Sequence, residues 1–215
     1  MSVSRDKAPV PAPVLKRLPR YLNYLRGRMQ AGVERVSSTV ISADLGLNPV
    51  QVRKDLAYVT DSGRPRTGFS VSELVHDLSA FLGHGSVKDA VLVGAGHMGT
   101  TLLAYGGFAG YGLNILAAFD VREELIGTEI CGKPIFPMSR LSEMTGRLRA
   151  SIGIITVPAE AAQAVCDELI AGGVRAIWNF APAHLEVPEN IIVQNEDIAA
   201  SLALLSNRLA EREER

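Results

Sequence analysis

Apolar residues near the start of the chain recur every three or four positions. Between residues 14 and 25 they fall at Val14, Leu15, Leu18, Tyr21, Leu22 and Leu25. This spacing predicts an amphipathic helix that ends at Gly32. Pro19 fits such a helix only in its first turn or at a kink. Residues 1–13 lack any periodicity, and we expect them to form a flexible arm.

Two shorter helices follow, separated by a glycine turn. Ser37 or Ser38 can cap a helix through about Leu45, and Gly46 supplies the turn. Asn48 is a favoured N-cap, and the proline after it suits the first helical position. In this second helix the apolar face is Val52, Leu56 and Val59, and the opposite side carries Gln51, Arg53, Lys54 and Tyr58. The pattern predicts a helix-turn-helix, whose second helix enters the major groove of DNA.

A loop with glycine and proline comes next and predicts a wing. It runs from Ser62 to Phe69 and carries two guanidinium groups, Arg64 and Arg66, which could contact the DNA backbone or the minor groove. Ser70 and Glu73 then form a capping box. The helix they open is stopped by Gly83 and Gly85, and we expect it to join two domains.

The charge is distributed unevenly between the two parts. Residues 1–85 hold 12 Lys and Arg against 7 Asp and Glu, whereas residues 86–215 hold 10 against 16, so their charges are +5 and −6. A basic first part is a candidate for binding a polyanion. The alternatives are a chance fluctuation of charge and a three-helix packing module with a solvated basic face. The basic helix followed at once by a basic loop favours DNA binding.

The second part begins with a short apolar strand, Val87–Val93, that runs into a glycine motif. Its residues are Gly94, Ala95, Gly96, His97, Met98 and Gly99, and a helix to about Phe108 follows. In this context backbone amides and the helix N-terminus can hold a pyrophosphate. The next strand, Leu113–Phe119, ends at Asp120, where a carboxylate accepts hydrogen bonds from ribose hydroxyls and repels a 2′-phosphate. The motif therefore predicts NAD⁺ and NADH as ligands, although Arg122 lies close to the acid.

Strands and helices continue to alternate to the end of the chain. The expected elements are strands at 134–136, 151–157, 174–179 and 191–193 and helices at 141–148 and 159–171. This rhythm predicts a parallel sheet with right-handed crossovers. Ligands bind at the carboxyl ends of such strands, which makes further candidates of Thr156, Val157, Pro158, Asn179 and Phe180. Each of these segments could equally be a plain turn.

The last segment predicts a helix with Asn195 as its N-cap. Its apolar stripe is Ile198, Leu202, Leu205 and Leu209, widened by Leu204. This stripe must be buried, either on the chain's own sheet or against a second subunit. The expected organisation is a DNA-binding domain at residues 1–85, a Rossmann domain at residues 86–193 and a dimerisation helix at residues 194–215.

Composition excludes several other classes. Hydrophobic residues make up 47% of the chain and charged residues 21%, which is typical of a folded domain. There is neither a membrane-spanning stretch nor the apolar core of a signal peptide, so we expect a cytoplasmic protein. Cys131 and Cys166 stand alone without metal-ligand spacing, so neither a disulfide framework nor a metal site is expected.

Several of these motifs together resemble the Rex family of redox-sensing transcriptional repressors. They are Arg17–Tyr21, Gln51–Leu56, Gly94–Gly99, Phe119–Asp120, Thr156–Ala162 and Asn179–Pro182, and they occur in the family's order over nearly the whole chain. The resemblance implies a homodimer with a winged-helix domain, a Rossmann domain and a C-terminal helix swapped against the partner. It also implies binding to an inverted-repeat operator that is lost when NADH binds.

The resemblance implies roles for further residues. In relatives a Tyr after the glycine helix and an Asp opening the swapped helix take part in the switch, and they match Tyr105 and Asp197. Relatives often have Phe after that Asp, inserted beside the partner's nicotinamide, where this chain has Ile198. Some carry an Arg in the first helix, where this chain has Asn23. The wing is also more basic than the glycine-rich wing of many members.

Two other functions remain open from the sequence. The first is a small NAD-dependent dehydrogenase, but the residues from Gly94 onward suffice for a cofactor domain and little else. His97 and His184 are more readily understood as loop residues than as proton donors, so we expect no catalytic residue. The second is a coenzyme A-binding or other nucleotide-binding partner subunit, against which Asp120 favours an NAD ribose.

Overall fold

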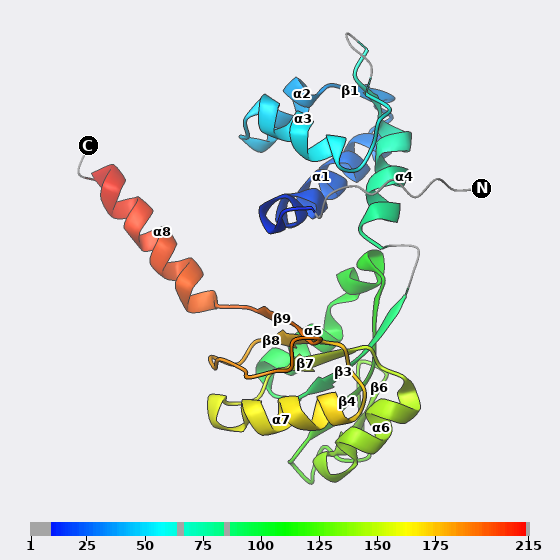
Figure 1. Cartoon of the computed structure of the whole chain (residues 1–215), viewed down its shortest axis with the longest axis vertical. Coiled ribbons are helices and arrows are strands. Elements are labelled where there is room, and N and C mark those ends of the chain that lie inside the picture. The colour runs from blue at the N-terminus through cyan, green and yellow to red at the C-terminus, as the bar shows by residue number, and fades with distance from the viewer. Residues whose placement is uncertain (1–9, 64–66, 84–86, 214–215) are drawn as a thin grey trace. The chain divides into compact units, whose positions relative to one another are not determined.

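The chain folds into two compact units, Met1–Ser86 and Val87–Arg215. The computed structural model describes residues 10–63, 67–83 and 87–213 (Figure 1). Each unit has its own hydrophobic core and is described by itself.

The first unit is a winged-helix arrangement of helices with a small two-stranded sheet. Its elements are α1 (Ala12–Gln30), β1 (Arg35–Val36), α2 (Ser38–Leu45), α3 (Pro49–Ala57), β2 (Phe69–Ser70) and α4 (Val71–Phe81). Strands β1 and β2 pair antiparallel, with Val36 opposite Phe69, and form the base of the wing. Gly68 enters β2 with a φ of +66°, and a Cβ there would lie 2.4 Å from the carbonyl oxygen of Val36. Only glycine fits this close approach.

The helix caps follow the sequence closely. The side chain of Ser37 accepts from the amide of Val40, and that of Asn48 accepts from the amides of Val50 and Gln51. Gly46 ends α2 in the left-handed conformation. Of the two positions expected for Pro19, the first turn is wrong, because α1 begins at Ala12 and Pro19 lies in its interior. The earlier start follows from Pro13, because proline suits the first helical turn.

The core of the first unit is assembled from the predicted helix faces. Leu18, Tyr21, Leu22 and Leu25 of α1 are fully buried against apolar residues of the other three helices, although Leu15 is exposed. From α3 the core receives Val52 and Leu56. Burial of these two side chains fixes the opposite face of α3 toward solvent.

The second unit is a doubly wound Rossmann-type sheet. Its elements are β3 (Lys88–Val93), α5 (His97–Ala104), the 3₁₀ segment η1 (Gly106–Tyr111), β4 (Leu113–Asp120), β5 (Glu129–Ile130), β6 (Lys133–Pro137), η2 (Met138–Arg140), α6 (Leu141–Leu148), β7 (Ile152–Ile155), α7 (Ala159–Ala171), β8 (Ala176–Asn179), β9 (Ile192–Asn195) and α8 (Ile198–Glu213). The strand order is β5-β6-β4-β3-β7-β8-β9, and the strands are parallel except for the antiparallel pair β5 and β6.

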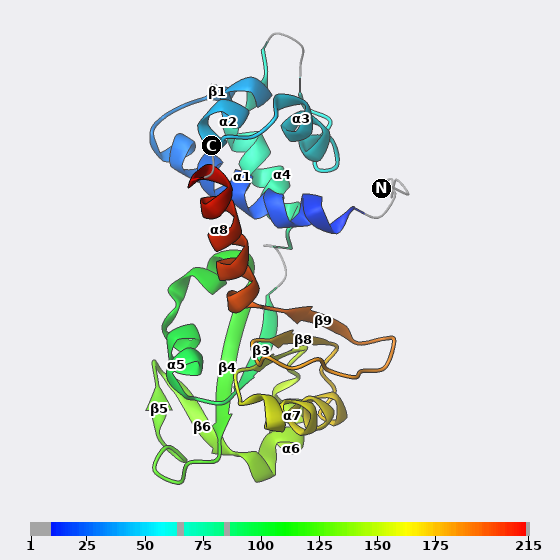
Figure 2. The same ribbon diagram turned by 90° about the vertical axis from the view of Figure 1, so that its left-hand side faces the viewer.

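Successive residues of β3 face opposite sides of the sheet. Val91 and Val93 pack in the core that holds α6 and α7, whereas Ala90 and Leu92 pack in the core beneath α5 and η1 (Figure 2). Both faces are therefore covered, which explains the continuous apolar run of this strand. The strand order reverses between β3 and β7, and such a switch point is where doubly wound folds bind ligands.

The C-terminal segment differs from the sequence prediction at its start. Asn195 belongs to β9 and lies opposite Asn179 of β8, so it does not cap the final helix. That helix, α8, begins at Ile198, and the side chain of Asp197 accepts from the amide of Ala200 at 2.8 Å. Two extra residues of strand pairing thus move the cap from Asn195 to Asp197.

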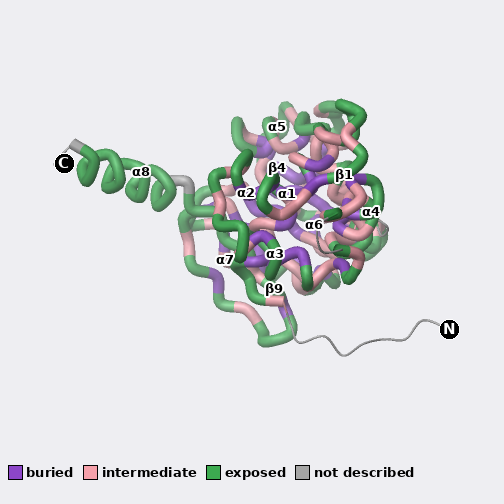
Figure 3. The backbone as a smooth tube through the Cα atoms, turned by 90° about the horizontal axis from the view of Figure 1, so that it is seen from above, coloured by how far each residue is buried: buried purple, intermediate pink, exposed green. Residues whose placement is uncertain are grey.

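The leucine stripe of α8 is exposed. Leu202, Leu204, Leu205 and Leu209 are each between 55% and 64% accessible, and exposed residues follow the helix along its length (Figure 3). Within this one chain the stripe is not buried on the sheet. No helix in the described residues is both long enough and apolar enough to cross a membrane.

Candidate nucleic-acid and dinucleotide sites

The candidate DNA-reading residues lie on the outer face of α3. Arg53 and Lys54 are exposed, and Gln51 and Tyr58 are half-buried. Arg64 and Arg66, which the sequence also proposes for DNA contact, lie outside the described residues. The chain thus presents two cations on the helix that would enter the major groove, and their types suit guanine edges and phosphates.

A partly buried ion pair joins α3 to α1 behind that face. Arg17 donates from Nε to Asp55 Oδ2 at 2.7 Å and from Nη2 to Oδ1 at 2.8 Å, and Tyr21 donates its hydroxyl to Oδ2 at 2.7 Å. The hydrogen bonds to Asp55 raise the pKa of Arg17. Burial, followed by the hydrogen bond to Asp55, raises the pKa of Tyr21 to about 12. Asp55 is only 4% exposed, so the carboxylate depends on these two partners.

The same guanidinium orients a candidate reading residue. In the amide orientation that satisfies both groups, the oxygen of Gln51 accepts from Arg17, 3.1 Å from Nη1 and 3.2 Å from Nε. An amide whose oxygen is engaged offers its NH₂ group to an outside partner.

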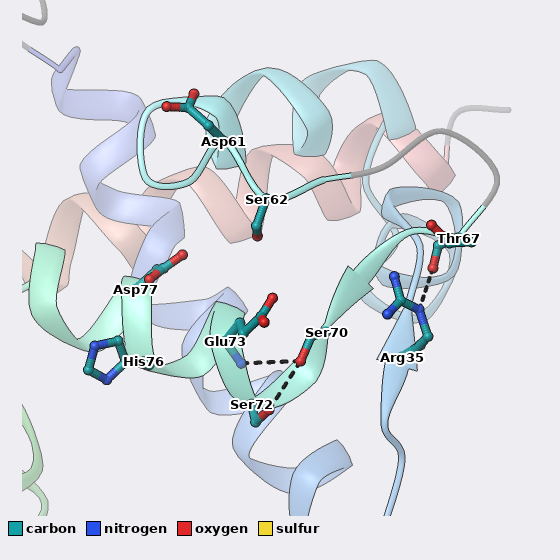
Figure 4. A pocket seen from close by; sticks show the side chains of 9 residues that line it. All are labelled: Arg35, Asp61, Ser62, Thr67, Ser70, Ser72, Glu73, His76 and Asp77. Atoms are coloured by element: carbon teal, nitrogen blue, oxygen red, sulfur yellow. Dashed lines mark hydrogen bonds between the residues drawn. The ribbon is translucent and has the colours of Figure 1, made fainter.

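A cavity of about 1010 Å³ lies at the base of the wing. Figure 4 shows its lining of hydroxyl and charged groups: Arg35, Asp61, Ser62, Thr67, Ser70, Ser72, Glu73, His76 and Asp77. Arg35 holds the wing by donating to the carbonyl oxygens of Thr67 at 2.8 Å and Gly68 at 3.2 Å. Because the acids outnumber this cation, the cavity is unsuited to a phosphate backbone.

The glycine motif forms a tight loop at the switch point. Gly94 has a φ of +97°, and a Cβ there would lie 2.9 Å from the carbonyl oxygen of Thr156. A Cβ on Gly99 would lie 2.0 Å from the carbonyl oxygen of Gly94. The hydroxyl of Thr156 is shared between the carbonyl oxygens of Val93 and Gly94, at 2.9 and 2.7 Å. Thr156, which directly follows β7, therefore fixes the glycine loop that leads into α5.

Six of the twelve candidate cofactor residues line one cavity. A volume of about 430 Å³ is lined by Gly94, Gly96, Asp120, Val121, Arg122, Met138, Thr156, Val157, Pro158, Ala161, Ala164, Val165 and Glu168. Gly96 is the N-cap of α5, which begins at His97, and Met98 is 38% exposed. Ala95 is buried. The cavity therefore joins the helix N-terminus to the acid at the end of β4, as a dinucleotide requires.

The Asp120 carboxylate is already fully engaged. Its Oδ2 accepts from the amide of Ala95 at 2.7 Å and from Arg122 Nη2 at 3.1 Å. Its Oδ1 accepts from the backbone amide and Nε of Arg122, at 2.9 and 3.0 Å. Burial alone would raise the pKa of this carboxyl, but the bonds from Arg122 and Ala95 lower it overall. Arg122 also donates to the carbonyl oxygen of Ala95 at 2.8 Å.

The two candidates that follow β8, Asn179 and Phe180, are not among the residues that line this cavity. Asn179 is fully buried; its amide donates to the carbonyl oxygens of Ala181 and Ala183 and to Asn195 Oδ1, and its oxygen accepts from the amide of Ala181. Those bonds make it a brace between β8, the following turn and β9. Phe180 instead lines a second cavity of about 460 Å³ together with His184 and Asp197.

An aromatic row links two of the candidate regions. Tyr105 contacts Phe108 with ring centres 4.8 Å apart, Phe108 contacts Trp178 at 5.4 Å, and Trp178 contacts Phe180 at 4.8 Å. Tyr105 is 56% exposed at the outer end of the row. The row therefore connects Tyr105 to the cavity that Asp197 lines, and both are candidate switch residues. The side chain of the third candidate, Ile198, is outside the part of the chain that the structure describes.

The sequence patterns missed some residues of these sites. Phe108 and Trp178 were assigned to ordinary elements, and only their aromatic character at the ends of a helix and a strand could have drawn attention to them. The bonds from Arg122 to both oxygens of Asp120 do not follow from the sequence, because a separation of two residues does not specify a bidentate contact. In the described residues no group of three potential ligands is placed to bind a metal ion.

Comparisons with known proteins cover both units. The N-terminal part, residues 9–57, matches a family model described as a putative DNA-binding protein N-terminus, and residues 86–183 match one described as a CoA binding domain. A curated protein of Porphyromonas gingivalis, named redox-sensing transcriptional repressor Rex, is 44% identical over 93% of this chain and 92% of its own.

Solved structures similar to this chain also cover nearly its whole length. A crystal structure of RSP in complex with β-NAD⁺ and operator DNA has a TM-score of 0.89 and 33% identity, covering 96% of this chain and 95% of that one. A second, of RSP with β-NADH, has a TM-score of 0.86 and 33% identity, covering 96% and 97%. A third, of RSP, a Rex-family repressor, has a TM-score of 0.86 and 33% identity. Both units of the chain thus have counterparts in one relative.

Proposed function

Since this chain belongs to the Rex family of redox-sensing transcriptional repressors, we propose that it represses transcription by binding an inverted-repeat operator as a homodimer and that NADH releases it. The observation that supports this most directly is the presence, in one chain, of a helix with outward cations and a glycine loop closed over a switch-point cavity. The cationic helix suits binding to a polyanion such as DNA, and the glycine loop suits binding to the pyrophosphate of a dinucleotide.

We assign the DNA contacts to α3 and the wing. Arg53 and Lys54 supply the outward cations, and Gln51 supplies an amide whose oxygen accepts from Arg17 and whose NH₂ group would donate to DNA. Tyr58 lines the same cavity, of about 600 Å³, as Gln51 and Lys54. The wing residues Arg64 and Arg66 are proposed from the sequence alone. Some of these side chains would contact base edges and others would contact phosphates.

We assign the dinucleotide to the switch-point cavity. The loop Gly94–Gly99 and the start of α5 would hold the pyrophosphate, Thr156–Pro158 would close the opposite wall, and Asp120 would face the adenosine ribose. Asn179 acts by bracing the neighbouring turn rather than by direct contact, because its amide is used within the protein. Phe180 belongs to the second cavity, where we place the redox-active nicotinamide that would distinguish NADH from NAD⁺.

The dimer contact is assigned to α8. Its four exposed leucines form an apolar surface that is stabilised only when another surface covers it. A second copy of this chain supplies an identical surface, and symmetric association is the usual outcome for such a case. A repressor of this kind works where the DNA is, which we take to be the cytoplasm.

The switch requires two arrangements of the dimer. One places the recognition helices about one DNA turn apart, and the other does not. NADH shifts the balance only by the difference between its affinities for the two arrangements. Tyr105, Asp197 and Ile198 are the residues we assign to that difference, because Tyr105 connects through aromatic rings to the cavity beside Asp197.

The test is fluorescence anisotropy of a labelled inverted-repeat operator of this family at fixed salt, with NAD⁺ or NADH titrated in. Fixed salt is necessary because phosphate contacts make the affinity steeply salt-dependent. Binding that NADH reverses and NAD⁺ does not would support the proposal. Binding that ignores both nucleotides would refute the sensing step, and no binding to several family operators would refute the repressor assignment.

The role of Asp197 can be separated from its capping role. Asp197→Asn keeps an N-cap acceptor for Ala200 and removes the charge, whereas Asp197→Ala removes both. We expect both variants to bind operator normally and both to require more NADH for release. If the Asn variant responds like the unmodified protein, the carboxylate charge has no part in the switch.

A further inference from the structure

The cavity that we assign to the dinucleotide contains a cation beside the acid that we assign to the adenosine ribose. Arg122 lines the cavity two residues beyond Asp120, and its side chain is 44% exposed. Val121 between them is 78% exposed, so this rim of the cavity is open to solvent. A group larger than a ribose hydroxyl therefore has room at this position.

The charge of Asp120 is also compensated. A carboxylate has about four acceptor positions, and the amide of Ala95 together with three N–H groups of Arg122 uses all four. An acid excludes a 2′-phosphate by repulsion and selects a 2′-hydroxyl by accepting its hydrogen bond. Here the adjacent guanidinium offsets the repulsion, and the engaged oxygens must exchange a partner before they can accept from ribose.

The guanidinium retains capacity for an anion. Its Nε and Nη2 face Asp120 and the carbonyl oxygen of Ala95, while Nη1 makes no hydrogen bond to any residue in the described part of the chain. Glu124 also acts on Arg122 through space, more weakly than Asp120. Arginine binds phosphate through several parallel N–H groups, so this cation can follow a phosphate at the open rim.

We propose that Arg122 makes this site accept the 2′-phosphorylated dinucleotide NADPH as well as NADH. The proposal rests on the assignment of the cavity to a dinucleotide. It makes Arg122 a specificity-determining residue with opposite effects on the two ligands, since it attracts the 2′-phosphate and competes with ribose for Asp120. The protein would then respond to the reduced pool of both nicotinamide cofactors.

The experiment is isothermal titration calorimetry of the full-length protein with NADH and with NADPH at one salt concentration. We expect the dissociation constants to differ by less than about tenfold, the ratio that one charge-assisted hydrogen bond controls. In Arg122→Gln, NADPH affinity should fall by about tenfold or more while NADH affinity stays equal or increases. Arg147→Gln is the matched control, because it removes an exposed arginine of the same domain that is paired with Glu143 on α6.

The outcomes separate this proposal from the proposed function. NADH binding with NADPH weaker by more than about tenfold overturns the dual specificity and leaves the NADH assignment intact. If the ratio of the NADPH and NADH dissociation constants changes equally in the Arg122 and Arg147 variants, Arg122 does not determine the specificity. If neither dinucleotide binds, the cavity assignment fails and this proposal fails with it. NADH binding by Arg122→Gln itself shows that the variant is folded.

Discussion

Removal of a single oxygen atom from Tyr21 tests the account of how α3 is held. Its hydroxyl donates to Asp55 at 2.7 Å, and its side chain is fully buried. Tyr21→Phe keeps the ring in the core and deletes one hydrogen bond to a charged, buried acceptor. Such bonds contribute about 1.5–3 kcal/mol. In a unit of this size about 2 kcal/mol corresponds to a fall of roughly 8–16 °C in its melting temperature.

The same hydroxyl predicts a dependence on alkaline pH. Tyr21 has a pKa of about 12 in the folded protein, above the ordinary value of 10.0, because burial and the hydrogen bond to Asp55 favour the neutral form. A raised folded pKa gives stability that is complete below pH 10 and is lost as the pH rises toward 12. The loss is on the order of 2 kcal/mol. Tyr21→Phe lacks this contribution, so the difference between the two proteins should shrink over that range.

The two units can be followed separately in one sample. Trp178 is the single tryptophan of the chain and reports the second unit, while far-UV circular dichroism reports both. In Tyr21→Phe the melting temperature of the first unit should fall, and the transition that Trp178 reports for the second unit should stay unchanged. Tyr105→Phe is the control, because it deletes a hydroxyl from a ring that is 56% exposed. A shift below about 2 °C, or an unchanged pH dependence, would contradict the reasoning.

Three further predictions concern the sites. Lys54→Ala should reduce the salt dependence of operator binding by about 0.9 for each copy bound, measured as the slope of log affinity against log salt; an unchanged slope would exclude a phosphate contact. Gly99→Ala places a Cβ 2.0 Å from the Gly94 carbonyl oxygen, so NADH affinity in calorimetry should fall by more than about tenfold while operator binding persists. Leu205→Glu adds a charge to the exposed stripe of α8 and should shift sedimentation toward the monomer, whereas an unaffected dimer would place the interface elsewhere.

Much of the fold was predictable because local signals coincided with long-range packing. Caps at Ser37, Asn48 and Ser70 set the helix starts, and the apolar residues within Val87–Val93 indicated the strand observed as β3. The glycine motif was informative because its neighbours, Val93 and Asp120, lay on two successive strands. The fold and the family assignment both follow from such patterns.

Other features depend on contacts that a linear pattern does not encode. Asn195 is an acceptable cap, but its backbone is used in β9 and its side chain accepts from Asn179, so the helix starts later. The pairing of Arg17 with Asp55 spans 38 positions of the chain. The saturation of Asp120 depends on the rotamer of Arg122. Distances between side chains, rather than propensities, decide these cases.

The link between α1 and α3 has a mechanical consequence for a protein that reads two half-sites. Because Arg17 and Tyr21 hold Asp55 inside the core and Arg17 also holds Gln51, the reading face cannot turn independently of α1. The first unit should therefore move as a rigid body, with the same internal distances on and off DNA. The side chains of α3 then determine which bases are recognised, and the distance between the first units of the two subunits determines the spacing of the half-sites. These two properties of an operator can change independently of each other.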